Sequence, residues 1–140
     1  MEALSAVAEG RIKQLSDKEA TVVSSDEQRE YKVYLDLDRG IASSTDNGTK
    51  FRGYIGYPIL ALMMLKGALP YNEDLASKLI GVKWRALNER YKSYRIVEKI
   101  VMDEYKKKGG DLDRLENLVK EVMEKLKNIE LFTPEEGEEI

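Results

Sequence analysis

Three aspartates near the end of one segment have types and spacing that suit a divalent cation. Asp36 and Asp38 are separated by one residue in the stretch REYKVYLDLD, and Asp46 follows in a turn. Residues two apart on a strand share a face and lie about 7 Å apart. Because magnesium and calcium prefer carboxylate oxygens, Asp36 and Asp38 are candidate metal ligands. The alternative is the solvated face of an alternating strand.

An Asp-x-Asp at a strand end is similar to the opening motif of haloacid-dehalogenase-type phosphatases. The resemblance covers only Asp36 to Gly40, and Arg39 stands where that family has glycine. It implies a metal-dependent enzyme, but the chain lacks the alternating strand and helix pattern of that fold. A carboxylate enzyme is therefore the third of three interpretations.

A second group of residues suits contact with nucleic acid. Arginine and lysine bind phosphates, and asparagine can pair with a base edge. The candidates are Lys83, Arg85, Asn88, Lys92 and Arg95.

These candidates lie in or beside the stretch EDLASKLIGVKWRALNERYK, residues 73–92. It resembles a helix-turn-helix motif, because Ser77, Gly81, Val82 and Leu87 have the motif's spacing. The resemblance implies a second helix that reads a DNA major groove. The side chains expected to be buried are Ala76, Ile80, Trp84, Leu87 and Tyr91.

The same stretch also suits an ordinary helical hairpin, since Glu89 would repel phosphate. Beyond it, Tyr91, Tyr94 and Tyr105 alternate with cations as far as Lys108. Aromatic rings beside cations can stack the bases of a single strand, so RNA is a possible partner as well as DNA. A helix that packs tyrosine inward and leaves lysine in water produces the same pattern.

The composition excludes several kinds of site. The chain has neither cysteine nor histidine, which rules out disulfides, thiolate clusters and imidazole catalysis. We therefore expect no enzyme activity and no cofactor. The N-terminus lacks a secretory pattern, and the longest apolar stretch, YPILALMML, is shorter than the roughly 18 residues of a membrane span. We therefore expect a cytoplasmic protein without membrane contact. Separately, the high content of charged residues is typical of proteins from thermophiles.

Charge is unevenly distributed along the 140 residues. Residues 51–108 contain 12 basic and 6 acidic side chains, whereas residues 1–50 and 109–140 carry net charges of −3 and −6. This pattern indicates either a basic binding surface or oppositely charged faces that attract each other.

The elements that must position these residues follow from periodicity. Alternation places Tyr31, Val33, Leu35 and Leu37 on one face of a strand. Shorter strands are expected at 10–16, 19–25, 40–45 and 49–54, the last two joined by an Asp46-Asn47-Gly48 hairpin. The sequence predicts a single α+β domain over residues 1–132: an antiparallel meander of four or five strands (5–55), then about four helices (57–131). Residues 133–140 are expected to be a mobile acidic tail.

Caps and breaks divide the helical half. A fully apolar helix is expected from Pro58 to Lys66, with Asn72 and Asp111 as later caps and Gly81 as a break. Whether the run 83–108 is one helix or breaks near Ser93 stays open.

The last helix carries heptad-like apolar spacing. Its stripe packs either on its own domain or against a second subunit.

The first interpretation of function is a non-enzymatic binding or assembly protein, a homodimer formed by the helical half; the alternative is a nucleic-acid binder using residues 73–92. The self-association candidates are Leu115, Val119, Val122 and Leu126.

Overall fold

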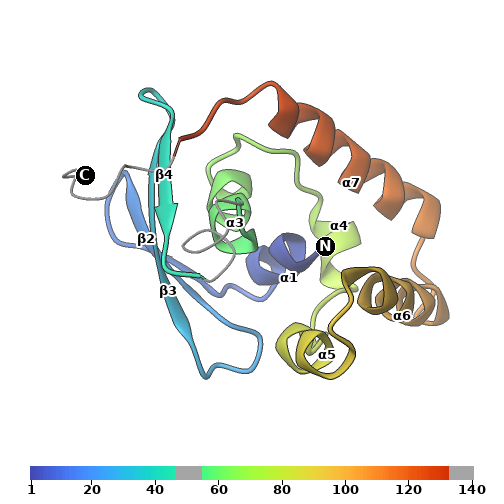
Figure 1. Cartoon of the computed structure of the whole chain (residues 1–140). Helices are drawn as coiled ribbons and strands as arrows, with labels where there is room; N and C mark the ends of the chain where they lie inside the picture. The colour runs from blue at the N-terminus through green and yellow to red at the C-terminus, as the bar shows by residue number, and fades with distance from the viewer. Residues whose placement is uncertain (47–54, 133–140) are drawn as a thin grey trace.

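The protein folds into an N-terminal antiparallel sheet followed by a set of helices (Figure 1), which confirms the α+β class. The computed structural model describes residues 1–46 and 55–132. The predicted strand 49–54, the Asn47-Gly48 turn and the acidic tail lie outside these residues. The elements are α1 (Glu2–Ala8), β1 (Ile12–Gln14), β2 (Glu19–Val23), β3 (Glu30–Asp36), β4 (Ile41–Ser44), α3 (Tyr57–Leu65), α4 (Glu73–Ser77), α5 (Trp84–Tyr91), α6 (Tyr94–Lys107) and α7 (Leu112–Lys127).

The sheet has the order β1-β2-β3-β4, and every neighbouring pair is antiparallel. Val33 lies opposite both Ala20 and Ser44, so these three residues share one face. Val33 and Leu35 are buried, as the alternation predicted. The expectation that Leu37 continues this face is wrong: β3 ends at Asp36, and Leu37 lies exposed in the following turn.

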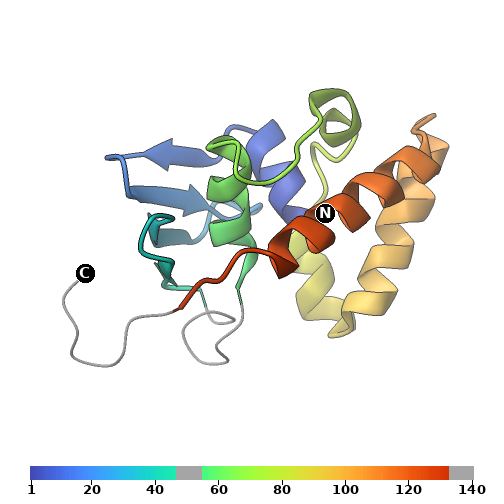
Figure 2. The ribbon, with the colours of Figure 1, turned by 90° about the horizontal axis from the view of Figure 1, so that it is seen from above.

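Helix α3 occupies the centre of the molecule. Gly56 precedes it in an extended conformation, and Pro58 suits its first turn. Ile59, Ala61 and Leu62 are completely buried, because β3 and β4 cover one side of the helix and α1 covers another. Figure 2 shows the sheet on one side of α3 and helices α4 to α7 on the other.

The N-terminal helix α1 was not predicted, and its residues 5–8 fall in the range 5–55 that was expected to be rich in strands. Its sequence EALSAVA consists mostly of strong helix formers. Leu4 and Ala6 are buried, and the Ser5 hydroxyl donates to the Leu79 carbonyl at 3.1 Å. Seven residues are too few for a helical period to be recognised, although their propensity carried a signal.

The predicted helix caps are confirmed. The side chains of Asn72 and Asp111 accept hydrogen bonds from Leu75 N (3.0 Å) and Arg114 N (3.1 Å). The run 83–108 breaks into two helices, because Lys92 adopts a left-handed conformation. The Ser93 side chain then caps α6.

The chain after α7 returns to the edge of the sheet. Phe132 N donates to the Gly40 carbonyl at 2.7 Å, and Ala42 N donates to the Phe132 carbonyl at 2.9 Å. Gly40 has φ +67°, and a Cβ there would lie 2.9 Å from the Glu130 carbonyl oxygen. Glycine is therefore needed for both the turn and the close approach.

The apolar stripe of α7 packs on its own domain. Leu115 and Val122 are buried, while Val119 and Leu126 are partly buried against the same core. Met123, on the same helix, is exposed. Two of the four predicted self-association residues are thus covered within one chain. Of the described helices, none has both the length and the apolarity that crossing a membrane requires.

Leu115→Ala is expected to lower the free energy of unfolding by about 2–5 kcal/mol, because it opens a cavity in the core. Met123→Ala, on the exposed side of the same helix, should change it by less than about 0.5 kcal/mol. Urea denaturation measures both values. A lower molar mass for Leu115→Ala, with its stability unchanged, would instead mark the stripe as a subunit interface.

Candidate functional site

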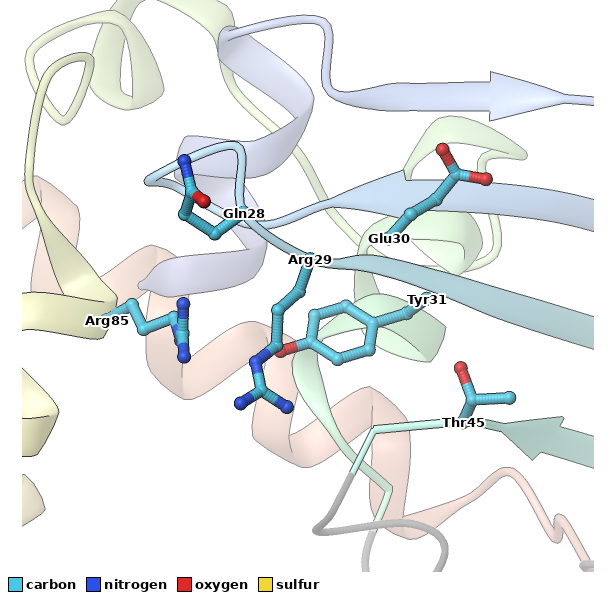
Figure 3. A pocket seen from close by; sticks show the side chains of 6 residues that line it. All are labelled: Gln28, Arg29, Glu30, Tyr31, Thr45 and Arg85. Atoms are coloured by element: carbon cyan, nitrogen blue, oxygen red, sulfur yellow. The ribbon is translucent and has the colours of Figure 1, made fainter.

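A cleft of about 620 Å³ lies between the sheet and helix α5. An adjoining hollow of about 610 Å³ shares Arg29, Tyr31 and Arg85 with it. We call the two together the sheet–α5 cleft. Figure 3 shows Arg85 extending from α5 toward the strand side that carries Arg29 and Tyr31. The site is therefore built from segments more than 50 residues apart in the sequence.

Helix α5 presents one face to this cleft. Arg85, Asn88 and Glu89 line it, and their spacing of three and one residues places them on one side of the helix, while Lys92 lines the cleft just after α5 ends. Trp84, on the neighbouring side, is buried in the core. The packing of Trp84 therefore fixes the direction in which the polar face points.

An ion pair ties α5 to the turn between β2 and β3. Arg85 Nη1 lies 2.6 Å from Asp26 Oδ2, and Arg85 N donates to the Ser25 hydroxyl at 3.2 Å. Asp26 Oδ1 accepts from the Ser24 hydroxyl (2.6 Å) and from Gln28 N (3.1 Å). The pKa of Asp26 is lowered to about 2. The hydrogen bond from Ser24 has the largest effect, and those from Gln28 and Arg85 add to it. Asp26 thus stays ionised beside Arg85.

The cleft also holds cations without such partners. Among the described residues, neither Arg29 nor Lys92 forms an ion pair. Arg85 is different, because Glu89 contacts it as well, at 3.3 Å. Arg29 and Lys92 are therefore the positive charges most available to an anionic ligand.

Aromatic rings lie along the same cleft. The Tyr31 and Tyr57 rings meet edge to face, with centroids 6.1 Å apart. Tyr94, at the start of α6, lines the cleft as well and is 74% exposed. The cleft thus offers flat apolar surface beside its charges.

Glu2 contributes a carboxyl group whose charge depends on pH near neutrality. Burial raises the pKa of Glu2 to about 7, although Arg11 opposes the shift; Asp46 adds to it. Burial also raises the pKa of Tyr57, so its hydroxyl stays protonated. Glu2 therefore gains its proton near neutral pH, and the neutral form repels an anion less than the carboxylate does.

The structure brings together three of the five predicted nucleic-acid contacts. Arg85, Asn88 and Lys92 line the cleft, whereas Lys83 and Arg95 are exposed outside its lining. Sequence reasoning missed Arg29, Tyr31 and Glu2. Neither Arg29 nor Glu2 belongs to a motif, and only the fold brings them to α5.

The helix-turn-helix resemblance holds only in part. Gly81 has the positive φ (+89°) that a tight turn requires, and Ala76 and Trp84 are buried as expected. However, α4 has only five residues, and six residues separate it from α5, more than the 3–4 residues of such a turn. The expected burial of Ile80 and Tyr91 is wrong: both are exposed, and Leu79 fills the core instead.

Asp36 and Asp38 line one small hollow, but Lys18 shares it. Asp36 is buried with Lys18 Nζ 3.4 Å from its Oδ2, and its Oδ1 accepts from Arg39 N at 3.2 Å. Asp38 lies two residues after the end of β3. Because β4 pairs antiparallel with β3, Asp46, which follows β4, lies toward the start of β3. Within the described residues, no three carboxylates are grouped to hold a metal. The Lys18 ammonium opposes a cation there.

Glu2 should make stability depend on pH. Because its folded pKa is raised, its contribution is complete below about pH 4.5 and is lost as the pH rises through about 7. The loss should be about 3 kcal/mol. Urea denaturation from pH 4.5 to 8 measures it, and Glu2→Gln should remove this part of the slope. An identical slope in Glu2→Gln would show that Glu2 ionises normally in the fold.

The comparisons with known proteins give a family but no close relative of known role. Neither a curated protein nor a solved structure matches the chain. The family described as "Uncharacterised conserved protein UCP014422" matches residues 1–132. Since this match covers nearly the whole sequence, the chain belongs to that family.

Proposed function

We propose that this protein is a non-enzymatic nucleic-acid-binding protein whose site is the sheet–α5 cleft. One observation carries the proposal: Arg29 from the sheet side, Asn88 from α5 and Lys92 just after α5 line one cleft. The two cations have no ion-pair partner in the described part of the chain. Cations of this kind bind phosphates, and an amide can bind a base edge.

The distribution of ion pairs supports this proposal over a purely structural role for the basic segment. If the cations of residues 83–108 served to hold the acidic last third, ion pairs would join them. Within residues 1–46 and 55–132, Arg85 pairs with Asp26 and Glu89, and Lys107 pairs with Glu104. No ion pair in these ranges joins residues 83–108 to α7. The basic surface therefore keeps charge for an external partner.

Self-association through the helical half remains a prediction of the sequence. Leu115 and Val122 are already used inside one domain, so a second copy would have to contact other residues. The cleft offers the better-supported site, because its charged and aromatic groups are accessible in a single chain.

Labelled oligonucleotides should bind with an affinity that falls steeply as salt rises from about 50 to 200 mM. Arg29→Gln and Lys92→Gln should each weaken binding and lower the salt slope by about one unit or slightly less. Fluorescence anisotropy measures both. Lys120→Gln, an exposed lysine on α7, is the matched control and should have little effect. Absence of binding at 50 mM salt would refute the proposal, as would equal weakening by all three variants.

Asp26→Asn should strengthen binding, because it frees Arg85 from a competing carboxylate. An asparagine oxygen can still accept from the Ser24 hydroxyl and from Gln28 N, so the turn should keep its shape. Removing one adjacent charge is worth about 1 kcal/mol in water, or about 5-fold in affinity. Glu121→Gln removes the same charge from the exposed surface of α7. Equal affinities for these two variants would show that Arg85 does not contact the ligand.

A further inference from the structure

The polar face of α5 points toward the sheet and not outward. Arg85 contacts Asp26 at 2.6 Å and Ser25 at 3.2 Å, and both residues belong to the turn between β2 and β3. A helix reads duplex DNA by inserting an exposed face into the major groove, which is about 12 Å wide. Because the turn already lies against this face, a duplex cannot receive Arg85 and Asn88 in that way. A ligand thinner than a duplex can enter the cleft.

The corner between α5 and α6 displays two tyrosines beside the cleft. Tyr91 ends α5 and is 37% exposed, while Tyr94 begins α6 and is 74% exposed. Two residues form the turn between α5 and α6. Lys92 has a left-handed backbone conformation, and the Ser93 hydroxyl caps α6 by accepting a hydrogen bond from Ile96 N at 3.4 Å. Tyr94 is therefore an exposed ring held on an ordered turn, next to Lys92, whose ammonium forms no ion pair within residues 1–46 and 55–132.

We infer that the ligand is a single-stranded nucleic acid with a base stacked on Tyr94, an inference that rests on the proposed function. Arg29 and Lys92 would contact its phosphates, while Asn88, on the cleft face of α5, can meet a base edge. The bases of a duplex are already stacked and paired, so they cannot cover the Tyr94 ring. Stacking on an aromatic ring tolerates any base, and the binding should therefore depend little on sequence.

The test compares single strands of RNA and DNA with a duplex of the same sequence, by fluorescence anisotropy at one salt concentration. Single strands should bind more tightly than the duplex. Tyr94→Ala should weaken single-strand binding roughly 5- to 100-fold, which corresponds to the loss of one stacked base. Tyr94→Phe keeps the ring and should recover most of the affinity lost in Tyr94→Ala. Met123→Ala, at an exposed apolar position on α7, is the control for general surface effects.

A spectroscopic measurement tests the stacking directly. The chain has one tryptophan, Trp84, which is 4% exposed. Tyr94→Trp adds an exposed indole, whose emission a single strand should quench and a duplex should not. In the unsubstituted chain, the buried Trp84 should respond little to either ligand.

The outcomes separate this inference from the proposed function. A duplex that binds as tightly as the single strands would overturn the inference and leave nucleic-acid binding intact. The same conclusion would follow if Tyr94→Ala bound single strands with unchanged affinity. If neither single strands nor duplex bound at low salt, both the inference and the proposed function would be wrong.

Discussion

Helix α3 sets the arrangement of the molecule, because its sequence leaves no face that can meet water. Ile59, Ala61 and Leu62 point in different directions around the helix, and all are completely buried. A helix that is apolar all round needs a layer on each side. The sheet supplies one and α1 another. This constraint brings the first residues of α3, α1 and β3 to the same end of the core, and Tyr57, Glu2 and Tyr31 from these positions line one cleft.

The opposite wall of the cleft depends on a polar contact. Trp84 anchors α5 in the core, and Arg85, the next residue, reaches the β2–β3 turn through Asp26. Two neighbouring residues therefore hold the helix, and the hydrogen bond from Arg85 N to the Ser25 hydroxyl holds it at the turn without the Asp26 charge. The residues that follow at helical spacing, Asn88 and Lys92, must then face the sheet. The arrangement turns a helical hairpin with a partial helix-turn-helix resemblance into one side of a groove.

Local patterns predicted most of the fold, but they could not predict the cleft. Period-two alternation found β3, and cap residues such as Asn72 and Asp111 marked the helices, because these signals act between residues close in sequence. The alternation did not show that β3 stops at Asp36, so Leu37 was misplaced. The apolar stripe on α7 showed that Leu115 packs against an apolar surface, but it did not show whether that surface belongs to the same domain or to a second subunit. Glu2 and Arg29 gave no signal, since their role depends on contacts more than 50 residues away.

Net charge is a poor guide to what such a cleft can bind. The chain carries −3 overall, which by itself would repel a polyanion. At physiological ionic strength, however, exposed charges are screened beyond about 8 Å, so the charges nearest the ligand decide. In the sheet–α5 cleft these include Arg29 and Lys92, which form no ion pair within the described residues. They also include the carboxylates of Asp46 and Glu89, and that of Glu2, whose pKa is raised to about 7 by burial. Because acidic groups stand beside them, Arg29 and Lys92 can attract a phosphate only at short range, so the contact should weaken rapidly with salt.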